Sequence, residues 1–177
     1  MIPPPLPPVD APTFRKFMGG WATGVAVVTA RDGARDAGLT VNAFLSVSLT
    51  PPSVLISLAR DVDTLPVLEA SRAFAVSFLA ADQRSLSERF ARAIPPAEKF
   101  RDVPFHRGST GAALPDGTLG AAECRVVSLT PLHDHVLVAA DVVRVERGRD
   151  APPLLFFRSA YAEPDPDGRL HLPGTRP

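Results

Sequence analysis

Residues 38–58, GLTVNAFLSVSLTPPSVLISL, constrain the fold more than any other stretch of this chain. Every second position from 39 to 49 is apolar, and the positions between them are small and polar except for Phe44. This period of two is typical of a β-strand with two different faces. Pro51 and Pro52 cannot donate hydrogen bonds to a β-ladder. The stretch therefore predicts two strands, the second at residues 53–58, with a change of direction at the prolines.

Further strands and a few short helices are predicted elsewhere. Apolar runs rich in β-branched residues predict strands at residues 25–30, 73–79, 122–132, 135–147 and 153–161. Helical spacing and capping patterns predict a helix that follows Thr13 and carries Phe14, Phe17, Met18 and Trp21, one at 63–71, and one at 82–92 capped by Asp82. There is no regular βαβ alternation with a glycine fingerprint. We therefore expect a mainly β fold, a small β-barrel with short peripheral helices.

Composition excludes several classes of protein. Lys plus Arg and Asp plus Glu both number 19, so no net charge attracts nucleic acid or a membrane surface. Cys124 is the only cysteine, which fits a reducing compartment and a small buried side chain. The N-terminus lacks the pattern of a signal peptide, and no apolar run is long enough to span a membrane. We expect one cytoplasmic domain, preceded by a Pro-rich arm at residues 1–12.

Motifs of hydrolytic or metal chemistry are weak. His133 and His135 form a His-x-His pair, but no regular spacing relates His106 and His171 to that pair, so no metal site is expected. The glycine-containing stretch GSTGAALPDG lacks the Walker lysine, and the carboxylates form no motif. The polar face of residues 40–48 suits a ligand such as a phosphate beside a planar heterocycle, or an ordinary polar layer. The pattern alone leaves both interpretations open.

Five blocks in order resemble the short-chain flavin reductases. They are FRKFMGGWATGVAVVTA, GLTVNAFLSVSLTPPSVLISL, FAVSFLAADQRSLSERFA, HDHVLVAADV and LLFFRSAY. The resemblance implies an FMN-binding split β-barrel of Greek-key type at residues 13–162, followed by a C-terminal tail at 163–177. It also implies a homodimer that uses FMN or FAD with NADH or NADPH and supplies diffusible reduced flavin to a partner monooxygenase.

The resemblance assigns roles to particular residues. It implies contacts with the flavin ring by Thr40, Val41, Asn42, Ala43 and Phe44, and with the ribityl phosphate by Ser46, Val47 and Ser48. It places Asp61, Thr64 and Arg89 on the phosphate or adenylate side. It places Asp134, His135, Arg158 and Tyr161 at the nicotinamide, with His135 as the catalytic residue.

The sequence therefore predicts an NAD(P)H-dependent flavin reductase. Two alternatives remain open. One is a flavoprotein of the same fold whose bound flavin acts directly on a small molecule, and the other is a non-catalytic flavin-binding protein. The Asp134-His135 pair favours the reductase.

Overall fold

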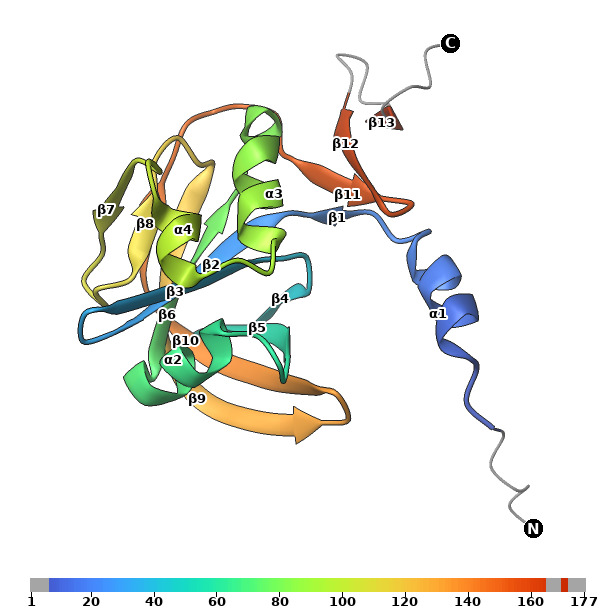
Figure 1. Cartoon of the computed structure of the whole chain (residues 1–177), viewed down its shortest axis with the longest axis horizontal. Coiled ribbons are helices and arrows are strands. Elements are labelled where there is room, and N and C mark those ends of the chain that lie inside the picture. Colours follow the sequence, from blue (N-terminus) through green and yellow to red (C-terminus); the bar gives the residue numbers. More distant parts are fainter. Residues whose placement is uncertain (1–6, 165–169, 172–177) are drawn as a thin grey trace.

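The structure is a computed structural model, and it describes residues 7–164 and 170–171. Residues 1–6 of the predicted arm and most of the predicted tail lie outside the described residues. Within the described part, seven antiparallel strands form one sheet in the order β3-β2-β6-β9-β10-β5-β4 (Figure 1). They are β2 (Ala26–Asp32), β3 (Arg35–Val41), β4 (Phe44–Leu49), β5 (Pro52–Ala59), β6 (Ala73–Phe78), β9 (Gly120–Leu132) and β10 (His135–Arg147). The mainly β fold is confirmed. The sheet is open, with β3 and β4 as its edges, which is consistent with a split barrel.

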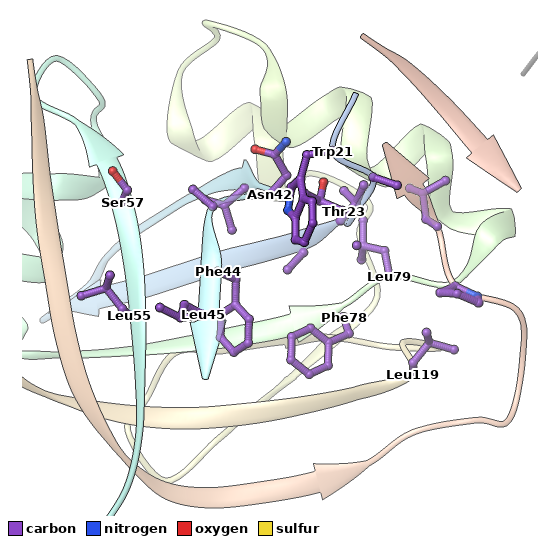
Figure 2. Close-up of a pocket in the computed structure, with 18 of the residues that line it drawn as sticks. Trp21, Thr23, Asn42, Phe44, Leu45, Leu55, Ser57, Phe78, Leu79 and Leu119 are labelled. Atoms are coloured by element: carbon purple, nitrogen blue, oxygen red, sulfur yellow. The ribbon is translucent and has the colours of Figure 1, made fainter. Parts of the chain in front are cut away.

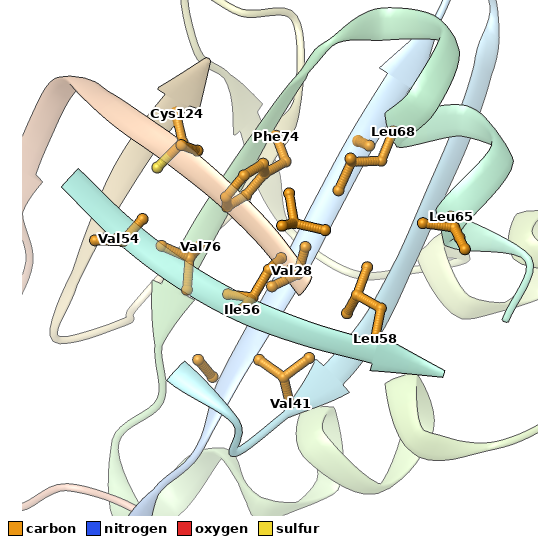
Figure 3. Close-up of a cluster of buried hydrophobic side chains, with 14 of the residues drawn as sticks. Val28, Val41, Val54, Ile56, Leu58, Leu65, Leu68, Phe74, Val76 and Cys124 are labelled. Atoms are coloured by element: carbon orange, nitrogen blue, oxygen red, sulfur yellow. The ribbon is translucent and has the colours of Figure 1, made fainter. Parts of the chain in front are cut away.

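The main hydrophobic core lies on one face of this sheet. Figure 3 shows side chains from β2, β3, β5 and β6 converging with side chains of the helix α2 (Thr64–Ser71). Along β5 every second residue is buried, namely Val54, Ile56 and Leu58. Cys124 is fully buried in the same core, and this burial, with a smaller effect of the neighbouring Glu123, raises the pKa of its thiol to about 12. The prediction that Cys124 is a small core residue is confirmed.

The alternating stretch forms two strands on the N-terminal side of the prolines. β3 ends at Val41, Asn42 and Ala43 form a link, and β4 runs from Phe44 to Leu49. The pairing register with β5 shifts between Ser46 and Ser48, so Ser46 lies opposite Val54 whereas Ser48 lies opposite Ser53. Because an extra residue in one strand reverses its alternation, the two serines do not share a face. The expectation of one continuous polar face through residue 48 is therefore wrong.

The predicted strand at 153–161 is in fact a hairpin. β11 (Leu155–Phe157) and β12 (Ala160–Pro164) pair across a two-residue turn, Arg158-Ser159, in which both residues have positive φ. Such a turn closes a tight hairpin although neither residue is glycine. In the described residues, this hairpin lies between β1 (Thr23–Gly24) and β13 (Leu170–His171) in a second sheet, and β7 (Phe105–Arg107) pairs with β8 (Ala113–Pro115).

The helices are short, as expected, but two of their starts differ from the prediction. α1 (Ala11–Met18) is capped by Asp10, whose carboxylate accepts from the backbone N–H of Thr13 at 2.8 Å, so Thr13 is not the cap. Asp82 lies within a 3₁₀ turn, η1 (Ala81–Gln83), and not at the cap of α3 (Arg84–Ala91). α4 (Pro96–Phe100) is the last helix of the described residues. None of the described helices has the length and apolar character needed to cross a membrane.

Candidate active site

A pocket of about 740 Å³ opens where the second sheet meets the main one. Its walls come from the segment after α1, β1, the β3–β4 link, β5, the end of β6 and residues just before β11 (Figure 2). The side chains are mostly apolar or aromatic, and none is charged. Pockets of this size and character suit planar aromatic ligands, with a few polar groups to orient them.

The β3–β4 link provides one wall because it leaves the regular ladder. Val41 is buried in the core, whereas Asn42 and Ala43 are exposed toward the pocket, and the carbonyl of Ala43 accepts from the N–H of Ser57 at 3.3 Å. Phe44 then turns its ring onto Phe78, with ring centroids 5.2 Å apart in an edge-to-face arrangement. The link therefore presents its backbone and the Asn42 amide next to an aromatic pair.

Of the predicted ring-contacting residues, four line this pocket: Val41, Asn42, Ala43 and Phe44. Thr40 lies one residue earlier, and its hydroxyl donates to the carbonyl of Ser87 on α3 at 2.6 Å. Ser46, Val47 and Ser48 lie further along β4, outside the pocket lining, and the Ser48 hydroxyl accepts from the N–H of Thr50 at 3.1 Å.

Three residues predicted on the phosphate or adenylate side lie away from this pocket. Asp61 is exposed between β5 and α2, and Thr64, the first residue of α2, is buried. Arg89 is on α3, where its guanidinium donates to the carbonyl of Arg101 and lines a separate pocket of about 310 Å³. The structure therefore does not bring these three residues to the pocket wall formed by Asn42 to Phe44.

His135 lies at the start of β10, on the sheet face that carries the pocket. It is paired directly with Ala59, as Leu137 is with Ser57, and paired residues project to the same face. Ser57 lines the pocket, and Ala59 is two residues, about 7 Å, further along β5. The imidazole Nδ1 lies 2.9 Å from a carboxylate oxygen of the exposed Asp134, and this hydrogen bond lowers the pKa of Asp134. The Asp134-His135 pair is thus accessible beside the pocket.

Arg158 and Tyr161 lie on opposite sides of the β11–β12 hairpin. The backbone N–H of Arg158 donates to the carbonyl of Gly19 at 2.9 Å, so the hairpin turn contacts the segment between α1 and the pocket. The hydroxyl of Tyr161 is 2.8 Å from that of Ser87, and its ring lies under the guanidinium of Arg84, so this side chain faces α3.

Sequence reasoning missed several pocket residues. Trp21 was expected on the first helix, but α1 ends at Met18, so Trp21 is 70% exposed and lines the pocket. Thr23, Ser57, Phe78 and Leu154 also line it. They come from three strands, β1, β5 and β6, and from the segments before β1 and β11, and only the register and packing of these parts bring them together. The one feature of the sequence that could have indicated the position of Trp21 is the Gly19-Gly20 pair. It ends the helix, so Trp21 lies in the connection to β1.

No metal site is formed by the described residues: no three His, Cys, Asp or Glu side chains among them are grouped so as to hold an ion. His106 lies between Asp116 and Glu146, far along the chain from His133 and His135. The side chain of His171 lies outside the described residues.

Comparison with known proteins gives consistent matches over most of the chain. Residues 18–165 match the family model described as flavin reductase like domain. The chain is 37% identical over 152 residues to the reductase component of 4-hydroxyphenylacetate 3-monooxygenase from Thermus thermophilus, covering 84% of this chain and 93% of that protein. It is 38% identical over 149 residues to FMN reductase (NADH) SmoA from Agrobacterium fabrum, covering 84% and 83%.

A solved structure agrees with these matches. The NADH:FAD oxidoreductase SgcE6 of Streptomyces globisporus, in complex with NAD and FAD fragments, has a TM-score of 0.84 and 33% identity, covering 90% of this chain and 96% of that one. A family model that spans most of the chain, relatives above 30% identity and a common fold all lead to the same assignment. The chain belongs to the family of proteins with a flavin reductase like domain.

Proposed function

We propose that this protein is an NAD(P)H-dependent flavin reductase that binds FMN or FAD in the pocket beside the β3–β4 link. The observation that carries the proposal is the uncharged, mainly apolar pocket of about 740 Å³, whose wall is formed by Asn42 to Phe44, in a member of this family. The ring system of a flavin is planar and largely apolar, with polar atoms along its edges. Such a pocket excludes water from the ring and leaves the edges to a few hydrogen-bonding groups.

We propose roles for these residues that agree with their places in the structure. When bound, the flavin accepts the hydride of the reduced nicotinamide. Asn42 and the backbone of Ala43 and Phe44 would orient the ring, with Thr40 and Val41 holding this segment against α3 and the core. We assign the segment Ser46 to Ser48 and, more remotely, Asp61, Thr64 and Arg89 to the phosphate or adenylate side on the basis of the family resemblance.

The nicotinamide would approach from the open face of the sheet. His135 lies on that face near Ser57, and we propose that it positions the nicotinamide over the flavin while Asp134 orients the imidazole. Arg158 lies near the segment that leads to Trp21, and we propose that it contacts the pyridine nucleotide. Tyr161 supports α3 in the same region. Hydride transfer between stacked rings depends on proximity and orientation, which these residues supply.

The setting of the reaction is also proposed. One relative is named as the reductase component of a monooxygenase, which supports a flavin-dependent monooxygenase as the recipient of the reduced flavin. Another is named FMN reductase (NADH), which supports NADH as the donor. We propose that residues 13–162 form the catalytic domain, that the protein acts in the cytoplasm, and that it works as a homodimer.

The function is tested with protein first stripped of bound flavin. Oxidation of NADH and of NADPH is measured at increasing concentrations of FMN and of FAD. We expect oxidation that requires added flavin and saturates with it, faster with NADH than with NADPH. If the flavin cannot be removed and the rate of oxidation does not depend on the concentration of added flavin, the flavin is a bound prosthetic group. Tight flavin binding without oxidation of either nucleotide would indicate a passive flavin-binding protein.

A further inference from the structure

Thr23 has a hydroxyl group without a hydrogen-bond partner. It belongs to β1, where its backbone is opposite Phe156 of β11, and it lines the pocket. Its Oγ1 atom is shielded from solvent and makes no hydrogen bond with any described residue. Burying a hydroxyl without a partner costs free energy, so native structures contain few such groups. An unpaired hydroxyl at a ligand pocket therefore indicates a partner that arrives with the ligand.

The pocket offers little else that could bind the polar atoms of a ring. Besides Thr23, the side chains with hydrogen-bonding groups that line it are those of Asn42, Ser57 and Trp21, whose indole N–H can only donate. Figure 2 shows Thr23 and Asn42 toward the end that carries Trp21, with Ser57 apart from them on β5. No charged side chain lines the pocket. A phosphate would need charged or multiple donors, so the group that meets Thr23 belongs to the neutral ring system and not to the phosphate.

The side chain of threonine can deliver this hydroxyl without a movement of the backbone. Oγ1 and the methyl group are attached to the same carbon atom, so a rotation between staggered rotamers about the Cα–Cβ bond can bring Oγ1 to the position of the methyl group, which then takes the position of the β-hydrogen. The ladder between β1 and β11 holds the backbone in place during that rotation. A hydrogen bond to the polar edge of a ligand would therefore favour the rotamer in which the hydroxyl points into the pocket.

We infer that Thr23 is a flavin-binding residue whose hydroxyl forms a hydrogen bond with the polar edge of the ring system. This inference rests on the proposed function, because it takes the flavin as the ligand of the pocket. In the ligand-free protein the same hydroxyl is a source of instability. Thr23 thus contributes to flavin affinity at the expense of the stability of the empty protein.

The decisive variant is Thr23→Val, which removes the hydroxyl and keeps the shape of the side chain. We compare the wild type, Thr23→Val and Thr23→Ser. Calorimetric titration measures their affinities for riboflavin and for FMN, and thermal unfolding without flavin measures their melting temperatures. We expect Thr23→Val to bind both ligands about 3- to 10-fold more weakly, the loss typical of one hydrogen bond, and to melt at the same or a higher temperature. Thr23→Ser keeps the hydroxyl and should bind both ligands nearly as the wild type does.

Ser77 provides a matched control. Its hydroxyl is also buried without a hydrogen bond among the described residues, but it lies on β6 outside the pocket lining. Ser77→Ala should leave the affinity for riboflavin and FMN unchanged. If Thr23→Val bound both riboflavin and FMN as tightly as the wild type does, the inference would be overturned. The same would hold if Thr23→Val bound only FMN more weakly. Either result would leave the reductase proposal intact. A lower melting temperature and weaker binding that Thr23→Ser fails to restore would show a structural role instead. Absence of flavin binding by the wild type would overturn both proposals.

Discussion

At the scale of single residues, His135 separates a reductase from a passive flavin binder. Its imidazole is 44% exposed and hydrogen-bonded to Asp134, so it contributes little to packing and is free to contact a nucleotide. Its place opposite Ala59, beyond Ser57, puts it beside the pocket proposed for the flavin and not within the lining of that pocket. A residue in this position can affect the second substrate without touching the first.

We therefore expect His135→Ala to change nucleotide kinetics and to leave flavin binding intact. The apparent KM for NADH should rise, or the rate of flavin reduction should fall, by about 10-fold or more, because the nicotinamide is held less well over the ring. Stopped-flow absorbance at the flavin band measures reduction, and calorimetric titration measures flavin affinity. His133→Ala, two residues away in the turn, serves as the control. Unchanged NADH kinetics in a folded His135→Ala protein would remove His135 from the active site.

At the scale of elements, long strands with continuous patterns were predicted best. The strand at 135–147 has the bounds of β10, and that at 53–58 lies within β5, because both are rich in apolar and β-branched residues and are bounded by turn signals. The break at Asn42-Ala43 was missed because the alternation of residue types continues through it. The turn at Arg158-Ser159 was missed because neither residue is glycine, although both have positive φ.

Within the pocket, too, some residues were predicted from the sequence and others were not. The segment Asn42 to Phe44 was predicted from its resemblance to a family, and it does line the pocket. Trp21 and Thr23 were not predicted, because their position depends on how β1 pairs with the β11–β12 hairpin. That pairing joins residues more than 130 positions apart in the sequence, and no local pattern encodes it.

One cross-element contact makes stability depend on pH. His106 of β7 lies between Asp116, after β8, and Glu146 of β10, with Nδ1–Oδ1 and Nε2–Oε2 distances of 3.1 and 3.0 Å. The hydrogen bond to Asp116, followed by that to Glu146, raises the pKa of His106. Because the folded pKa is the higher one, the stabilisation is complete below the unfolded pKa and is lost as the pH rises through the folded pKa.

The variant His106→Gln should therefore melt at a lower temperature than the wild type at about pH 5.5 and at nearly the same temperature at about pH 9. The side chain is 48% exposed, so the difference should be modest, below about 1 kcal/mol, and should shrink with added salt. Thermal melting of both proteins across this pH range measures it. A constant difference at all pH values would show that the charge of His106 does not stabilise the fold.

At the scale of the whole molecule, the single chain leaves apolar surface uncovered. Leu45, Val47 and Leu49 of the edge strand β4 are 56%, 55% and 86% exposed. α1 has no buried residue and projects away from the main sheet (Figure 1), with Phe14 and Phe17 also exposed. An apolar edge strand is a hazard for aggregation unless another surface covers it. An isologous contact with a second copy would cover the same patch on both chains.

We therefore expect light scattering at micromolar concentration to give twice the chain mass of 18.8 kDa. Val47→Asp should shift the protein toward monomer or aggregate, because a carboxylate cannot be buried unpaired in an apolar interface. Val47→Ile keeps the surface apolar and should remain dimeric. A monomeric wild type that binds flavin normally would contradict the homodimer.

The position of Trp21 has an optical consequence. It is the only tryptophan of the chain, and the only tyrosine, Tyr161, faces α3. Trp21 is largely exposed at the pocket. The intrinsic fluorescence of the protein, excited selectively at the indole band, therefore originates from one ring at the mouth of the pocket that we propose to bind the flavin. A flavin bound there lies within the range of energy transfer from that ring, so the native chain carries its own reporter of occupancy and needs no label.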